Sequence, residues 1–181
     1  MKKYDKLIIK AKQAYDKGDL DLASKYYEEA FKEKIIIADY LMLAYIYVDL
    51  NKYNLAEKIF KNVKMIDDGI EVHFGLANIY ERTGRKKDAI ELYSKVVEEN
   101  DDFDIAHFSL AYLYDEIGEE QEEDINGDNI SKAVIHYEKC LQLNNNNFWA
   151  HINLGSIYER NNIDDKALYH FSKAYKKNKN E

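Results

Sequence analysis

Apolar residues recur along the chain at the spacing of helices that each bury one face. Over 103–114 the apolar positions follow one another mostly in steps of three and four residues: Phe103, Ala106, Leu110, Ala111 and Tyr114. After a gap, a second segment shows the same spacing: Ala133, Tyr137, Cys140 and Leu141. Steps of this size place the apolar side chains on one face of a helix. The pattern therefore predicts two helices that pack against each other as a hairpin.

The two-helix pattern occurs five times. One alanine marks the second helix of each unit: Ala23, Ala56, Ala89, Ala133 and Ala167. Four residues after each alanine stands an aromatic residue: Tyr27, Phe60, Tyr93, Tyr137 and Phe171. A period of about 34 residues is typical of stacked helical hairpins. The chain, 1–181, is predicted to be a single repeat domain, with repeats at about 4–36, 37–69, 70–103, 104–147 and 148–181.

Small and turn-forming residues occupy matching places in all five repeats. Between the two helices stands a residue that takes a left-handed backbone conformation easily: Gly18, Asn51, Gly84, Gly118 and Asn162. The first helix carries a small residue that lets the two helices cross closely: Ala11, Ala44, Ala77, Ala111 and Gly155. These positions predict both the end of each first helix and the contact between the helices.

These motifs resemble the tetratricopeptide repeat, with its W-x2-L-G-x2-Y and A-x3-F signature. The clearest matches are Leu43-Ala44-x2-Tyr47 with Ala56-x3-Phe60, Leu76-Ala77-x2-Tyr80 with Ala89-x3-Tyr93, Leu110-Ala111-x2-Tyr114 with Ala133-x3-Tyr137, and Leu154-Gly155-x2-Tyr158 with Ala167-x3-Phe171. The first repeat is degenerate, and histidine replaces the early tryptophan in the last three repeats. The resemblance implies an all-α solenoid of five hairpins stacked into a right-handed superhelix.

The resemblance also implies a concave groove, lined by first helices, that receives peptides. Carried over by register, the candidate peptide-binding residues are Leu41, Tyr45, Phe74, Asn78, Phe108, Tyr112, Asp115, Glu116 and Trp149. An apolar strip flanked by carboxylates suits a protein or peptide with apolar and basic character. The alternative is that the aromatic rings fold onto neighbouring helices and thicken the core.

Composition narrows the choice of partner and compartment. A net charge of -8 argues against nucleic acid, which requires a basic surface. The apolar run Leu7–Ile9 is too short for a signal peptide, and no run is long enough to span a membrane. Cys140 is the only cysteine, so no disulfide can form within the chain. We therefore expect a cytoplasmic protein without a membrane partner.

The sequence offers no catalytic set and no cofactor motif, so we expect no enzyme and no cofactor. The five histidines occupy two repeat positions: His73, His107 and His151 in one, His136 and His170 in the other. Residues in register on successive hairpins lie roughly 8–10 Å apart, too far to share a metal. Packing roles are expected instead.

An acidic insert near 119–129 separates the helices of the fourth repeat. Its stretch Asp124-x-Asn126-Gly127-Asp128 resembles the opening of an EF-hand loop, but Ile135 stands where the closing glutamate belongs. A solvated acidic loop is the simpler interpretation. A calcium-modulated adaptor is the remote alternative.

The sequence thus predicts a scaffold for protein–protein interactions. The main alternative is a self-association or complex-assembly module that uses the C-terminal end. There the last helix keeps Leu168 and Tyr175, and the sequence provides no further helix to cover them. A homo-oligomer through this end is one form of that alternative.

Overall fold

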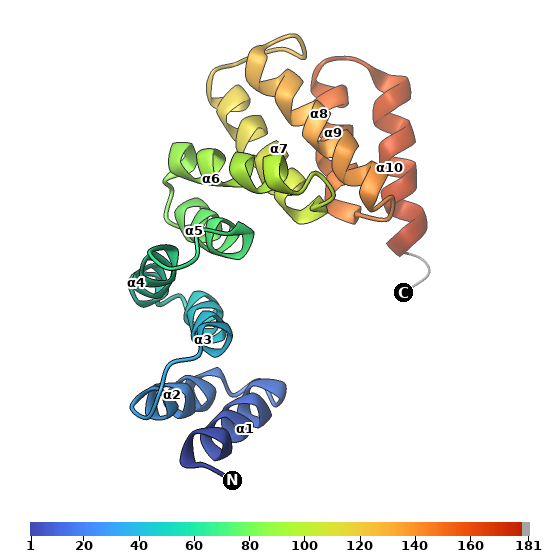
Figure 1. Cartoon of the computed structure of the whole chain (residues 1–181). Helices are drawn as coiled ribbons and strands as arrows, with labels where there is room; N and C mark the ends of the chain where they lie inside the picture. The colour runs from blue at the N-terminus through green and yellow to red at the C-terminus, as the bar shows by residue number, and fades with distance from the viewer. Residues whose placement is uncertain (179–181) are drawn as a thin grey trace. The chain divides into compact units, whose positions relative to one another are not determined.

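The structure, a computed structural model, describes the backbone of residues 1–178 and the side chains through Tyr175. Residues 1–178 form ten helices and no strands (Figure 1). The first five are α1 (Lys3–Asp16), α2 (Leu20–Phe31), α3 (Ile37–Asp49), α4 (Tyr53–Lys64) and α5 (Ile70–Arg82). The others are α6 (Lys86–Glu99), α7 (Asp104–Glu120), α8 (Asp128–Leu143), α9 (Phe148–Arg160) and α10 (Asp164–Asn178). The predicted end of the fifth repeat, 179–181, lies outside the described residues.

The helices belong to two compact units, Met1–Arg85 (unit 1) and Lys86–Glu181 (unit 2). Within each unit every helix packs against the next one along the chain. The prediction of an all-α helical repeat solenoid is confirmed. The division falls inside the third predicted repeat, between α5 and α6, so the single-domain organisation remains a prediction.

The small residues lie in the core where the helices cross. The alanines of the second helices are all at most 4% exposed: Ala23, Ala56, Ala89, Ala133 and Ala167. The glycines on first helices have the same role, because a Cβ at Gly75 would lie 2.2 Å from Phe60 Cζ and one at Gly155 2.6 Å from Phe171 Cε1. A larger side chain at these positions would push the paired helices apart.

The ends of the first helices follow one hydrogen-bond pattern. The left-handed residue predicted there is confirmed at Gly18, Asn51, Gly84 and Asn162, whose φ angles lie between 56° and 76°. In each, the next residue donates its N–H to a carbonyl five residues earlier, as Asp19 does to Ala14 at 2.9 Å, which closes the helix.

The prediction for Gly118 is wrong, because α7 continues past it to Glu120. Glu122 takes the left-handed conformation instead, with φ 53°, and Glu123 N donates to Gly118 O at 2.9 Å. Gly118 serves close packing, since a Cβ there would lie 2.4 Å from Ile130 Cδ1. The acidic insert therefore extends the first helix before it forms a loop.

We expect Ala89→Leu to destabilise the protein by about 1–3 kcal/mol through overpacking. Ala89 is 0% exposed, so the added atoms have no route to solvent. Urea unfolding followed by circular dichroism measures the change. Lys87→Leu is the control, because Lys87 is exposed on the same helix, and its stability should stay within about 0.5 kcal/mol of wild type. Equal stability of wild type and Ala89→Leu would contradict the assigned helix register.

Candidate functional site

Several predicted binding residues are packed into the helix layers. In unit 1, Leu41 is 5% exposed, and the ring of Tyr45 lies edge-on to Phe60 at 5.2 Å between centroids. In unit 2, Phe108 lies edge-on to Tyr137 at 5.8 Å. Phe108 packs against a core cluster of unit 2. These rings therefore contribute to packing, which leaves them less area for a ligand.

Two members of the unit 1 set, Phe74 and Asn78, lie on α5. Asn78 Oδ1 accepts a hydrogen bond from Arg82 Nε at 2.9 Å, one turn later on the same helix. Phe74, also on α5, is half-buried. The hydroxyl of Tyr45 donates to the backbone oxygen of Glu71 at 3.3 Å, which links α3 to the start of α5. Burial raises the pKa of Tyr45 well above its ordinary value. The Tyr45 hydroxyl therefore stays protonated as this donor.

Unit 2 leaves three large apolar side chains in solvent on its first helices. Ile105 and Tyr112 of α7 are 53% and 39% exposed, and Trp149 of α9 is 63% exposed. Tyr112 donates its hydroxyl hydrogen to Glu116 Oε1 at 3.1 Å. Glu116 in turn lies 3.2 Å from Lys86 Nζ, so the carboxylate has protein partners as well as solvent access. This face combines apolar rings with a carboxylate.

One arginine connects α7 and α9. Arg160 donates from Nη2 to Asp115 and from Nη1 to Glu119 Oε1, the latter at 2.6 Å. Asp115 is buried, and its burial raises the pKa of its carboxyl while the arginine opposes that rise. Asp115 therefore holds the two helices together, so that its carboxylate is not exposed to a ligand.

Four of the five histidines form two pairs that the sequence reasoning missed. His107 Nδ1 lies 3.0 Å from His136 Nδ1, and His151 Nδ1 lies 3.0 Å from His170 Nδ1. His107 Nε2 and His151 Nε2 each lie 3.1 Å from a backbone oxygen, of Asp101 and Asn145 respectively. A carbonyl oxygen can only accept, so these Nε2 atoms carry the hydrogen and their Nδ1 atoms accept from the partner histidine.

The two histidine positions face each other within one hairpin, whereas the sequence argument considered only distances between hairpins. The available signal was that the fourth and fifth repeats fill both positions with histidine, while the third has His73 with Leu92. Burial lowers the pKa of His136 and of His170 to about 4. Within residues 1–178, no group of three His, Cys, Asp or Glu side chains could hold a metal ion.

The acidic insert uses its carboxylates to fix its own backbone. Glu123 Oε2 accepts from the backbone N–H of Asn129 at 2.8 Å and of Ile130 at 3.2 Å, in the first turn of α8. Asp124 Oδ1 accepts from Asn126 N at 2.9 Å, and Asp128 pairs with Lys132 at 2.6 Å. Glu123 therefore caps α8. Asp124 and Asp128, the carboxylates that the calcium alternative would use, each have a different partner within the protein.

The chain is an array of helical hairpins, the architecture of a class of protein-interaction scaffold. Models of the tetratricopeptide repeat match residues 40–68, 70–103 and 136–169. The chain belongs to the tetratricopeptide repeat family, as its motifs predicted. No curated protein matches the sequence. Among residues 1–178, no helix combines the length and the apolar character needed to cross a bilayer.

Solved structures share the fold at low identity. A crystal structure of MamA is 24% identical and superposes with a TM-score of 0.77 over 99% of this chain and 96% of that one. MamA from Desulfovibrio magneticus RS-1 is 20% identical, with a TM-score of 0.80 over 100% and 98%. A tetratricopeptide repeat protein from Parabacteroides merdae is 20% identical, with a TM-score of 0.74 over 93% and 64%. These likenesses establish the fold alone.

Proposed function

We propose that unit 2 binds a peptide segment of a partner protein across the exposed faces of α7 and α9. The observation that carries the proposal is the exposure of Trp149 and Ile105, at 63% and 53%. They hold the same repeat position on two successive first helices, which Arg160 connects at their C-terminal ends. Large apolar side chains left in solvent in such an arrangement are typical of binding surfaces.

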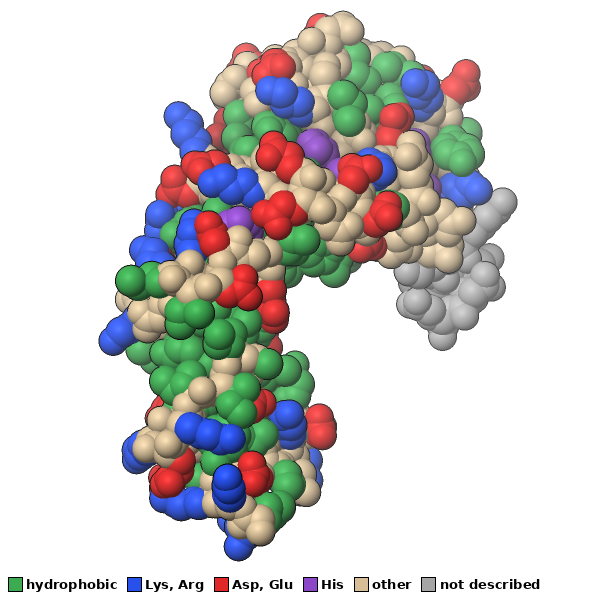
Figure 2. Space-filling model, viewed as in Figure 1, with side chains coloured by type: hydrophobic (Ala, Val, Ile, Leu, Met, Phe, Trp, Pro, Cys, Tyr) green, Lys and Arg blue, Asp and Glu red, His purple; other side chains and the backbone are tan. Residues whose placement is uncertain are grey.

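The charges around this face favour a partner with both apolar and basic side chains. Glu116 borders the ring of Tyr112, and Glu159 lies exposed near the C-terminal end of α9. Acidic side chains are spread over the visible face of unit 2 (Figure 2), and the whole chain carries a net charge of -8. Opposite charge accelerates encounter and selects among partners. We place this binding in the cytoplasm, where the single buried Cys140 stays reduced.

The predicted binding residues of unit 1 are not part of the proposed site. Leu41, Tyr45, Phe74 and Asn78 are buried or half-buried. Of the nine predicted residues, Trp149, Tyr112 and Glu116 have the most direct role in the proposal. Phe108 has a packing role, because its ring lies edge-on to Tyr137.

We expect Trp149→Ala and Tyr112→Ala each to weaken peptide binding by about 1–3 kcal/mol, because aromatic anchors carry much of the energy of an interface. Peptides selected from a random library on the immobilised wild-type protein provide the ligands, and fluorescence anisotropy gives their Kd. We expect the selected peptides to contain aromatic or aliphatic residues together with Lys or Arg.

The control for this experiment is Ile135→Ala. Ile135 is 61% exposed, like Trp149, but lies on the second helix α8. The Ile135 variant should bind as wild type does. If the selected peptides bound the Trp149 and Tyr112 variants with wild-type Kd, the proposed site would be wrong.

A further inference from the structure

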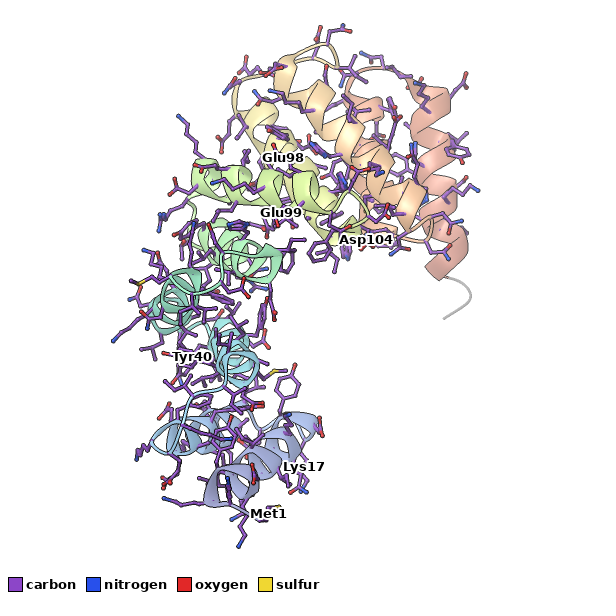
Figure 3. The ribbon with its side chains drawn as sticks, in the orientation of Figure 1. Met1, Lys17, Tyr40, Glu98, Glu99 and Asp104 are labelled. Atoms are coloured by element: carbon purple, nitrogen blue, oxygen red, sulfur yellow. The ribbon has the colours of Figure 1, made fainter. Side chains whose placement is uncertain are left out.

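Each second helix that is followed by another repeat receives the next first helix on one face. At the joint between α2 and α3, Phe31 meets Tyr40 edge-on at 5.3 Å, and Tyr47 donates its hydroxyl hydrogen to Glu28 at 2.6 Å. Figure 3 labels Tyr40 at this joint. At the joint between α8 and α9, Tyr158 donates to Glu138 at 3.3 Å. The receiving face thus has fixed repeat positions.

Helix α10 carries the same face with its apolar residues exposed. Leu168 stands one residue after the repeat alanine and is 71% exposed, whereas Ser24 at that position of α2 is 3% exposed. The aromatic four residues after the alanine is 0% exposed in the four earlier repeats: Tyr27, Phe60, Tyr93 and Tyr137. Its counterpart Phe171 is only partly buried. The difference is the covering first helix that the other four possess.

Two of the joints, α2–α3 and α4–α5, also have an ion pair between the second helix and the segment just past the next first helix. Lys52, just past α3, lies 3.0 Å from Asp21 of α2. Arg85, just past α5, lies 3.2 Å from Glu57 of α4. Asp165 of α10 has the register position of Asp21 and is exposed. A helix that covers α10 in the same way would place a residue just past its C-terminal end beside Asp165, where a basic residue is favoured.

A second copy of this chain fits the α10 face poorly. Its first helix, α1, would approach α10 as α3 approaches α2. At the position of Tyr47 and Tyr158, α1 has Ala14, so the tyrosine of the joint is missing. At the position of Lys52, the chain after α1 has Asp19, which would meet Asp165 with like charge. Both differences favour a helix from another protein.

We propose that the α10 face, defined by Leu168, Phe171 and Asp165, binds an amphipathic helix of a partner protein. That helix carries an aromatic residue on its docking face and Lys or Arg just beyond its C-terminal end. It covers α10 as a first helix covers α2, α4 and α8. Helix-in-groove docking of this kind uses anchors spaced by three or four residues. The surface is separate in residues and in ligand from the α7–α9 peptide site.

The probe is a synthetic peptide of residues 69–85 of this chain, which contains α5, Tyr80 and Arg85. Fluorescence anisotropy of the labelled peptide measures its Kd for the full-length protein. We expect saturable binding by wild type, about tenfold or more weakened by Leu168→Lys, which places a positive charge where Glu57 of α4 pairs with Arg85. The Arg85→Glu peptide should bind wild type more weakly and recover affinity with Asp165→Lys.

Two protein controls separate this surface from others. Ile135→Lys changes a similarly exposed residue of α8 and should bind the probe as wild type does, as should Trp149→Ala, which tests the α7–α9 site. Binding of the probe by Leu168→Lys with wild-type Kd, or no saturable binding by wild type, would overturn the proposal. So would light scattering that shows self-association of wild type abolished by Leu168→Lys, because the occupant would then be a second copy.

Discussion

Lowering the pH from 7 to 5 is expected to reduce the free energy of unfolding of unit 2 by about 2 kcal/mol for each histidine pair. His136 and His170 have folded-state pKa values of about 4, because burial and the neighbouring histidine disfavour their charged forms. In the unfolded chain both titrate near 6.5. The unfolded state thus binds more protons below pH 6.5, so stability is full above pH 6.5 and declines as the pH falls toward 4.

The groups around the pairs modify this response without reversing it. Beside His136 lie His107 and the stacked ring of Tyr114, with Lys132 over that ring, while Asp101 raises the pKa. Beside His170 lie His151 and the rings of Tyr158 and Tyr169, and Lys166 lowers the pKa. Desolvation is the largest influence on both.

Urea unfolding at pH 7.5 and 5.0 tests this expectation, with the fluorescence of Trp149, the only tryptophan, reporting on unit 2. His136→Leu reproduces the combination that the third repeat has, His73 with Leu92, and so does His170→Leu in the fifth repeat. Each substitution should remove about 2 kcal/mol of the loss between the two pH values. His73→Leu in unit 1 is the control and should leave the response of unit 2 unchanged. Identical pH responses of wild type and both variants would show that the pairs do not titrate as described.

The sequence was sufficient for the fold because a repeat tests each inference five times. The alanine of the second helix and the aromatic four residues later are buried as predicted in every repeat but the last, where Phe171 is only partly buried. That exception has a physical cause, since among residues 1–178 no first helix packs over α10 as one does over the other second helices. The prediction for Gly118 was wrong because glycine occurs both at helix ends and at close helix contacts. The residue type alone does not distinguish these two roles.

The candidate site was less predictable. The repeat register predicts which face of a helix a residue lies on, but not which neighbouring side chains cover or contact it. Leu41 of the second repeat and Trp149 of the fifth belong to the same predicted set of binding residues. Leu41 is nevertheless 5% exposed and Trp149 63% exposed. Asp115 was expected to face a ligand, and Arg160 pairs with it instead. The partner of a buried carboxylate comes from another helix, and periodicity along a single helix does not reveal it.

Removal of that partner is expected to destabilise unit 2 strongly. Arg160→Met leaves Asp115, whose side chain is 12% exposed, without its cation. An unpaired buried carboxylate costs about 3 kcal/mol, lowered to the extent that it takes up a proton. Burial already raises the pKa of Asp115, so the deficit of the variant relative to wild type at the same pH should shrink as the pH is lowered. Urea unfolding followed by Trp149 fluorescence at pH 7.5 and 5.5 measures both effects.

Asp115→Leu provides the matched comparison, because it removes the other member of the pair. Arg160 keeps Glu119 at 2.6 Å, and its side chain is 29% exposed, so its charge stays hydrated. We therefore expect a loss of only about 1 kcal/mol, and the double variant Asp115→Leu/Arg160→Met should be more stable than Arg160→Met alone, because it buries no charge. Equal losses for the two single variants would mean that Asp115 is better solvated than its burial implies, and that α7 and α9 are held together by apolar packing rather than by this ion pair.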